Sequence, residues 1–288
     1  LGLLVAVFFL TRMTGDPAGL YLPDTATLEM KQAYALAHGY SDPLAVQFWN
    51  YVLGLLRLDF GVSMRQQQSA MLTVFEAVPT TLTLTAIALT VSLTVTVLIG
   101  ALAASRPGGI FDRLATTISL IGASAPDFWV ALVGVLVFAV TLHWLPTSGT
   151  GGPQYWVMPV FVVCLRPLGL VTQVVRGTMI SVLSEPYIKT AKAKGLGRGA
   201  ILAQALRSSL LPVITVGGDI AVGMINGSLI AETVFGLHGV GKVLIDAITN
   251  RDFAVVQSAV LVVAIAIFVL NILIDVLYAL VDPRIRYN

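Results

Sequence analysis

The feature that most constrains the fold is a run of uncharged residues between Glu76 and Arg106. An α-helix needs about 20 mostly apolar residues to cross the hydrocarbon core of a bilayer, so this run is long enough for one span. Only 11% of the 288 residues are charged, whereas soluble domains carry about 25% charged residues. The sequence therefore predicts an all-α membrane protein, and it excludes an ordinary soluble enzyme, a disordered protein and a nucleic-acid-binding protein.

Five segments have the length and apolar character of complete spans, and a sixth is incomplete. The complete spans are predicted at 79–104, 114–142, 156–175, 211–235 and 253–281. Pro126-Asp127 interrupts the second of them. The N-terminal segment 1–10 is about half a span. Because it is too short and wrongly flanked for a signal peptide, we expect it to be the remainder of a first transmembrane helix, which gives six helices in total.

Lysine and arginine are concentrated in alternate connections, as the positive-inside rule predicts. Ten of the 17 basic residues fall in 105–113, 176–208 and 282–288. Both termini, including the tail at 282–288, are therefore predicted to be cytoplasmic. Segment 11–76 is polar with short amphipathic pieces, and we expect a helical extracytoplasmic segment there, followed by a transmembrane domain over 77–281.

The sequence shows no recognisable metal site or catalytic group. Its single cysteine, Cys164, allows neither an internal disulfide nor a thiolate zinc cage. Gly236 to Lys242 fits the start of a phosphate-binding loop, but Val243 stands where that motif needs serine or threonine for Mg²⁺. We interpret this stretch as a glycine-rich turn before an amphipathic helix, and we expect a chain that is not an enzyme and holds no cofactor.

The connection 176–208 is basic and contains short amphipathic pieces. Pro186 after Glu185 is typical of a helix start, and the predicted helix continues to Lys194 before the break at Gly195-Leu196-Gly197. Short polar helices of this kind need another protein to pack against. An ordinary positive-inside loop with helices on the membrane surface is the alternative, and composition does not decide between the two.

Short motifs follow one another along nearly the whole chain. They are Gly15-Asp16-Pro17, Leu58-Asp59-Phe60-Gly61-Val62-Ser63, Pro79-Thr80-Thr81-Leu82, Pro126-Asp127-Phe128-Trp129, Trp144-Leu145-Pro146, residues 185–196, Leu206-Arg207, Leu211-Pro212, Glu232-Thr233-Val234-Phe235, Gly239-Val240-Gly241, Arg251-Asp252-Phe253, Val256-Gln257 and Asp282-Pro283-Arg284. In this order and spacing, they resemble the permease subunits of bacterial ABC importers in the dipeptide, oligopeptide and nickel group. The resemblance implies the type I ABC importer permease fold.

The resemblance also implies a set of partners in the bacterial inner membrane. A second permease subunit would complete the pathway, two separate ATPase subunits would bind ATP and Mg²⁺ on the cytoplasmic side, and an extracytoplasmic binding protein would deliver the substrate. Di- or oligopeptides are the expected cargo, with nickel chelates or glutathione as the alternative. Two other classes stay open at this point, an ion-driven secondary transporter and an intramembrane enzyme, although no inverted repeat or cluster of catalytic groups supports them.

By the same resemblance, 185–199 corresponds to the coupling segment, which docks into a groove on the ATPase. The residues expected to make this contact are Glu185, Tyr187, Lys189, Thr190, Ala191, Lys192, Ala193, Lys194, Gly195 and Leu196. Only Ala191 and Gly195 match the general E-A-A-x-x-x-G pattern literally. The residues themselves fit the role, because Ala191 and Ala193 are small enough to admit a close partner and Gly195 can take the positive φ that ends a helix.

Three charged residues, Asp127, Arg166 and Asp219, fall inside predicted spans. Each costs about 2.5–3.5 kcal/mol on insertion scales, so each is expected to have a partner or a function. Arg166 lies ten residues before Arg176, and Asp219 lies ten residues after Ser209, which places both at a similar depth on neighbouring helices. We expect Arg166 to pair with Asp219, with Asp127 nearby, either as a structural ion pair or in the translocation pathway.

Overall fold

The computed structural model describes residues 2, 5, 8, 9, 22, 26–37, 39–57, 59–63 and 65–281, without the side chains of Leu55, Leu56, Leu211 and Val281. Most of the expected first helix at 1–10 and the whole tail at 282–288 lie outside the described residues. Within the described ranges the regular structure is helical, apart from one isolated antiparallel bridge between Val62 and Ser69. The predicted all-α class is therefore confirmed.

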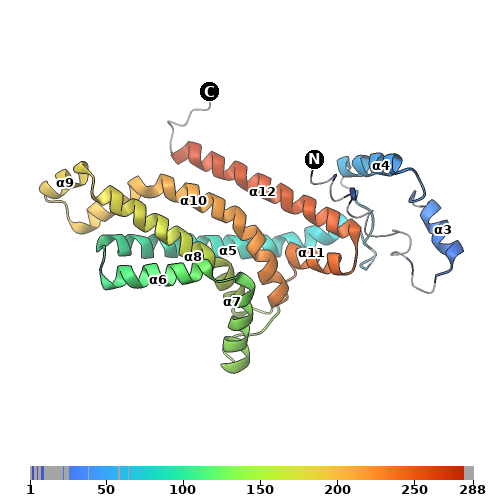
Figure 1. Ribbon diagram of the computed structural model, residues 1–288, viewed down its shortest axis with the longest axis horizontal. Helices are drawn as coiled ribbons and strands as arrows, with labels where there is room; N and C mark the ends of the chain where they lie inside the picture. The colour runs from blue at the N-terminus through green and yellow to red at the C-terminus, as the bar shows by residue number, and fades with distance from the viewer. Residues whose placement is uncertain are drawn as a thin grey trace. The chain divides into compact units, whose positions relative to one another are not determined.

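The helices follow one another along the chain with short connections (Figure 1). They are α3 (Leu28–Ala37), α4 (Leu44–Leu56), α5 (Ala70–Ser105), α6 (Ile110–Ser124), α7 (Asp127–Gly134), the π-helix η1 (Val135–Thr141), α8 (Gln154–Leu183), α9 (Pro186–Ala193), α10 (Arg198–Phe235), α11 (Val240–Thr249) and α12 (Phe253–Val281).

Four helices of the described chain are long and apolar enough to cross a membrane: α5, α8, the part of α10 from Pro212 to Phe235, and α12. Each overlaps a span predicted from the sequence. However, α10 begins at Arg198 rather than at Leu211, because the helix continues through Pro212. A proline is tolerated inside a membrane helix when neighbouring groups satisfy the backbone carbonyl that loses its donor.

The predicted span at 114–142 is not straight. It consists of α6 and the pair α7–η1, which are bent by 102° at the break between them. The bend follows from Pro126, which disfavours helical backbone in the residue before it. Ala125 accordingly takes an extended conformation with φ −74° and ψ 131°, and α7 begins again at Asp127.

The chain divides into two compact units. The first comprises Leu1–Pro79 and His238–Ile265, and the second comprises Thr80–Leu237 and Ala266–Asn288, so that α5 and α12 contribute to both. In the first unit, Ser63 donates a buried hydrogen bond to Asp252 with an Oγ–Oδ2 distance of 2.7 Å. This bond joins two of the sequence motifs, and it fixes the segment before α5 to the start of α12.

In the second unit, α6 packs closely against α8. Gly169 of α8 makes this approach possible, because a Cβ there would lie 2.7 Å from the Cβ of Ala123 and would also collide with the Ser119 carbonyl. Gly122 on α6 similarly faces Leu165, whose carbonyl lies 3.3 Å from the Cβ position. Small residues of this kind are what membrane helices use to bring their backbones together.

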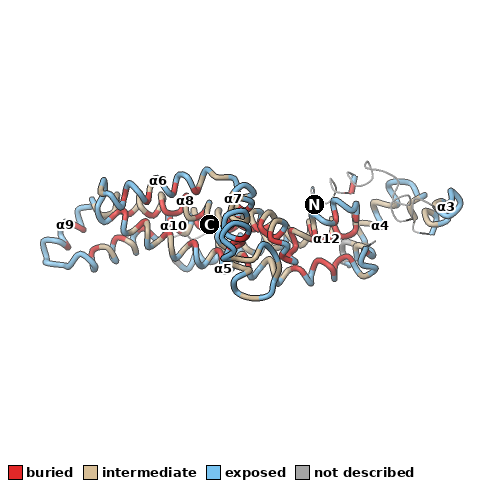
Figure 2. Tube along the Cα trace, turned by 90° about the horizontal axis from the view of Figure 1, so that it is seen from below, coloured by how far each residue is buried: buried red, intermediate tan, exposed pale blue. Residues whose placement is uncertain are grey.

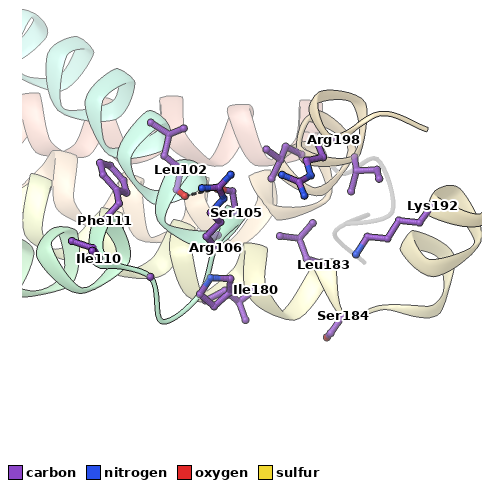
Figure 3. Close-up of a pocket in the computed structure, with 15 residues that line it drawn as sticks. Leu102, Ser105, Arg106, Ile110, Phe111, Ile180, Leu183, Ser184, Lys192 and Arg198 are labelled. Carbon is purple, nitrogen blue, oxygen red and sulfur yellow. Dashed lines mark hydrogen bonds between the residues drawn. The ribbon is translucent and has the colours of Figure 1, made fainter. Parts of the chain in front are cut away.

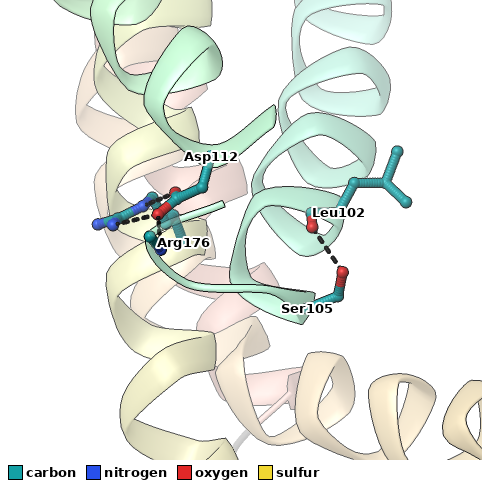
Figure 4. Close-up of polar contacts among 5 residues, drawn as sticks. Leu102, Ser105, Asp112 and Arg176 are labelled. Carbon is teal, nitrogen blue, oxygen red and sulfur yellow. Dashed lines mark hydrogen bonds and ion pairs between the residues drawn. The ribbon is translucent and has the colours of Figure 1, made fainter. Parts of the chain in front are cut away.

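The end of the same helix pair is joined by an ion pair between Asp112 and Arg176 (Figure 4). The Arg176 guanidinium donates from Nε to Asp112 Oδ1 and from Nη2 to Oδ2, the latter at 2.9 Å. The Gly108 amide also donates to Asp112 Oδ2, at 2.8 Å. Asp112 is only 3% exposed, and it lies in the first turn of α6, where the helix dipole favours a negative charge.

Candidate functional site

The predicted coupling segment forms a short helix, α9, between two sharp breaks of the chain. Glu185 precedes the helix with φ −64° and ψ 149°, and Pro186 occupies its first turn, as predicted. The Glu185 carbonyl accepts the amides of Ile188 and Lys189 at 3.1 and 3.3 Å. In Figure 1, α9 lies beyond the ends of α8 and α10, the two helices that it connects.

Only two residues of α9 are buried, and they lie on one face. Ile188 is fully buried and Ala191 is 8% exposed, three residues further on. The rest of 185–199 is exposed, including Lys189, Thr190, Lys192, Ala193, Lys194 and Leu196 (Figure 2). The Ala191 methyl group packs against its own chain, whereas Ala193 is accessible, and the predicted contact of this segment with the ATPase stays a prediction.

The C-terminal end of α9 is closed by a Schellman motif. The amide of Leu196 donates to the Ala191 carbonyl at 3.2 Å, and the amide of Gly195 donates to the Lys192 carbonyl at 3.0 Å. Gly195 has φ +83°, as predicted for a residue that ends the helix. A Cβ on Gly195 would meet no atom within 4 Å, so the need for glycine comes from the backbone conformation alone.

One side-chain hydrogen bond ties α9 to the helix that follows. The Tyr187 hydroxyl donates to Ser208 Oγ of α10 at 3.1 Å, although Tyr187 is 41% exposed. Together with the burial of Ile188, this bond fixes the orientation of α9. A displacement of α9 by a bound partner would therefore be passed on to α10.

The three charged residues predicted inside the spans line one cavity of about 350 Å³. Asp127 comes from the start of α7, Arg166 from α8 and Asp219 from α10. Gly223 and Asn226, which follow Asp219 along α10, also line this cavity. The structure thus brings Arg166 and Asp219 to one cavity, as the comparison of their depths predicted, and Asp127 lies there too, as expected.

The direct ion pair that we predicted is absent. Among the described residues, the ion pairs within 4 Å join Arg176 to Asp112 and Lys242 to Asp246, and Arg166 is in neither. Arg166 and Asp219 are instead exposed on the surface of this chain, and Asp127 is half-buried. A charge in the middle of a span costs about 2.5–3.5 kcal/mol on insertion scales, so such residues normally face a bundle interior or a water-filled cavity rather than lipid.

The loop that resembles a phosphate-binding loop is a turn between two helices. Gly236 ends α10 with φ +65°, Gly239 precedes α11, and Val243 is buried in α11, which confirms the predicted turn and helix. In the part of the chain that the structure describes, no three His, Cys, Asp or Glu side chains are grouped in a way that could hold a metal ion.

Sequence reasoning missed the Asp112–Arg176 pair, since Arg176 was counted only as one of the basic residues of a cytoplasmic connection. The sequence does limit the acidic residues that could pair with Arg176. The connections 105–113 and 176–208 contain only two acidic residues, Asp112 and Glu185, and the predicted topology places both connections on the same side of the membrane.

The long apolar helices define a helical membrane protein, and comparison with known proteins identifies the family. Residues 96–287 match the family described as "Binding-protein-dependent transport system inner membrane component". The chain belongs to this family of ABC transporter permeases. It is therefore a multi-pass protein of the inner membrane and a transport component rather than an enzyme, and it works with ATPase and substrate-binding partners.

Relatives of similar length support the assignment. A probable peptide ABC transporter permease protein of Sinorhizobium fredii is 35% identical, over 98% of this chain and 94% of its own length. The oligopeptide transport system permease protein of Haemophilus influenzae is 36% identical, over 97% of this chain and 92% of its own length. The di/tripeptide transport system permease protein of Pseudomonas aeruginosa is 33% identical, over 100% of this chain and 97% of its own length.

Solved structures support the fold. A chain of the methionine ABC transporter MetNI, in an inward-facing conformation, superimposes with a TM-score of 0.62 and 16% identity, over 74% of this chain and 97% of that chain. A chain of an amino acid ABC transporter crystallised with histidines gives a TM-score of 0.56 at 15% identity, over 72% of this chain and 92% of that chain. The predicted ABC importer permease fold is thereby confirmed.

Proposed function

We propose that this chain is one of two permease subunits of an importer for di- or oligopeptides, and that α9 transmits ATP-driven movement of the ATPases to the spans. Three relatives named as peptide permeases match the chain over nearly its whole length, which supports peptides over nickel chelates or glutathione. The observation that carries the proposal is α9, an exposed helix with three lysines in or directly after it, which the described residues hold through one buried face and the hydrogen bond of Tyr187.

The proposal also assigns the sides of the membrane. With α9 on the cytoplasmic side, both termini would be cytoplasmic, and segment 11–76 would face the extracytoplasmic binding protein. ATP and Mg²⁺ would be held by the ATPase subunits and not by this chain. The cavity lined by Asp127, Arg166 and Asp219 would open onto the pathway between the two permease subunits, because charges exposed on this chain are stable there and costly against lipid.

Uptake by the reconstituted complex tests the proposed cargo. Proteoliposomes would contain the permease with its partner subunits. ATP would be supplied on the side of the ATPase subunits, and the binding protein with a labelled tripeptide would be added on the opposite side of the membrane. We expect ATP-dependent accumulation of the peptide, with unlabelled peptides competing and glutathione or a nickel chelate failing to compete. Accumulation of nickel or glutathione instead would reject the peptide assignment and leave the permease assignment intact.

Crosslinking tests the role of α9. In an Ala193→Cys variant labelled with a maleimide–benzophenone photocrosslinker, we expect irradiation to join the new cysteine to an ATPase subunit, because Ala193 is exposed, whereas the native Cys164 is 1% exposed. The matched control is Thr249→Cys, an exposed position at the end of α11, on the opposite side in the proposed topology. Equal crosslinking of the two variants to the ATPase would contradict the proposal.

Arg166 gives a prediction for the pathway. Arg166 is exposed, and among the described residues it forms no ion pair within 4 Å. Arg166→Gln should therefore leave the complex stable but lower the rate of peptide uptake. A hydrogen bond to a charged group contributes about 1.5–3 kcal/mol, which corresponds to at least a tenfold loss of rate if Arg166 contacts the passing carboxylate. Uptake rates of the Arg166→Gln variant and of an Arg166→Lys variant, which keeps the positive charge, would check the predicted loss. Unchanged uptake by Arg166→Gln would show that this cavity is not part of the translocation pathway.

A further inference from the structure

A second and larger cavity lies near α9, and it is lined mainly by the ends of helices. Its volume is about 1060 Å³, and its walls come from the last turn of α5, the turn into α6, the last turn of α8, and the start of α10 (Figure 3). Three cations line it: Arg106 from the turn after α5, Lys192 from α9, and Arg198 from the first position of α10. We call this cavity the basic groove.

The charge of the basic groove is not balanced by the part of the chain that the structure describes. None of its described lining residues is acidic. Asp112, which follows the lining residue Phe111, is already bound by Arg176 and by the Gly108 amide. Within the described residues, no carboxylate lies within 4 Å of Arg106, Lys192 or Arg198, so the groove attracts an anion.

The remaining walls of the groove are apolar and accessible. Leu102, Ile110 and Phe111 are 55%, 81% and 49% exposed, and Ile180, Leu183 and Leu202 complete the apolar lining. A small inorganic anion gains nothing from such walls. An amphiphile gains about 25 cal/mol for each Å² of apolar surface that it buries, so the walls favour an anion with hydrocarbon chains.

The position of the groove along the spans fits the same ligand. Ser105 is the last residue of the span in α5, and Leu183 is the last residue of α8, so both spans end at this groove. Arg106 directly follows α5, Lys192 lies in α9 and Arg198 begins α10, so all three cations lie outside the apolar spans, whereas Leu102, Ile180 and Leu183 lie within them. This arrangement puts the charges next to the headgroup region and the apolar lining toward the hydrocarbon. Basic pockets between membrane helices at this depth bind anionic headgroups.

From these observations we infer that the basic groove binds an anionic phospholipid, with its phosphate between Arg106, Lys192 and Arg198 and its chains along α5 and α6. Because Lys192 belongs to α9, the bound lipid would fix α9 to the turn after α5. The lipid site itself is independent of the proposed cargo, since it follows from the groove alone.

Native mass spectrometry of the complex purified with its partner subunits tests the site. The complex in detergent would be titrated with phosphatidylglycerol and with phosphatidylcholine of the same chains. We expect phosphatidylglycerol to bind more tightly, and Arg106→Gln to weaken it about fivefold, the effect of one basic residue near an anionic headgroup. Arg113→Gln is the matched control, because Arg113 is exposed in the same region of α6 but does not line the groove.

Several results would overturn the inference. Equal binding of the two lipids, or equal loss of phosphatidylglycerol in the Arg106→Gln and Arg113→Gln variants, would show no headgroup site in the groove. Displacement of the lipid by millimolar inorganic phosphate alone would show a site for a small anion. Release of the ATPase subunits by Arg106→Gln, with lipid binding unchanged, would show that the groove is a protein interface.

Discussion

Replacing Gly195 by proline is expected to leave the assembled transporter in the membrane but to uncouple ATP hydrolysis from uptake. Gly195 has φ +83°, and its amide donates to the Lys192 carbonyl at 3.0 Å. Proline has φ near −65° and no amide hydrogen, so the chain would leave α9 in another direction. Because such a mismatch costs about 3 kcal/mol or more, we expect peptide uptake to fall by at least tenfold while the ATPase subunits still hydrolyse ATP.

A proline two residues further on provides a matched control. Gly197 has φ −65°, which suits proline, and a Cβ there would meet no atom within 4 Å. Gly197→Pro should therefore keep most of the uptake, and Gly195→Asn should give an intermediate loss, because asparagine tolerates positive φ better than other side chains. Parallel assays of uptake and ATP hydrolysis would check the series, and normal uptake by Gly195→Pro would contradict the role of α9.

The spans could be predicted from the sequence because a bilayer imposes a simple requirement on composition. Long, mostly apolar runs located α5, α8, the later part of α10, and α12. Proline was a less reliable guide to boundaries. Pro126 does break the chain, since Ala125 is extended before it, whereas Pro212 lies inside α10. The sequence marks where a backbone donor is missing, but not whether neighbouring groups allow the helix to continue.

The predicted ion pair failed for a geometrical reason. Counting residues from the ends of two helices gives the depth of a side chain, and it correctly brought Arg166 and Asp219 to one cavity, which Asp127 also lines. It gives no information on how each helix is rotated about its axis. Residues at one depth can therefore face a shared cavity without touching, as Arg166 and Asp219 do.

The buried face of α9, by contrast, was within reach of the sequence. Ile188 and Ala191 are three residues apart, so helical periodicity alone places them on one face, and the apolar Ile188 indicates that this face points inward. We had instead interpreted the small side chain of Ala191 as room for a close partner. The accessible part of the helix is its lysine-bearing side together with Ala193.

Asp112→Asn is expected to destabilise the permease by about 1.5–3 kcal/mol, because a hydrogen bond to a charged group contributes about that much and its partner Arg176 is 28% exposed rather than fully buried. Asp112 is 3% exposed and holds both Arg176 and the Gly108 amide, so its loss would loosen α6 from α8 and from the turn before it. The free energy of unfolding in detergent, measured by denaturant titration, would check this value. The double variant Asp112→Leu/Arg176→Met should recover most of the loss, because apolar replacement of a buried pair is often neutral.

Asp246→Asn is the matched control for this prediction. Lys242 and Asp246 also form an ion pair, at 2.9 Å, but within one helix and with Asp246 54% exposed. Exposed pairs four residues apart contribute about 0.3–0.5 kcal/mol, so this variant should be nearly as stable as the parent. Equal small losses in Asp112→Asn and Asp246→Asn would show that close packing at Gly169, and not the ion pair, holds α6 against α8. A large loss in Asp112→Asn alone would show that the two helices depend on the charge pair at their ends as well as on the glycine contact between them.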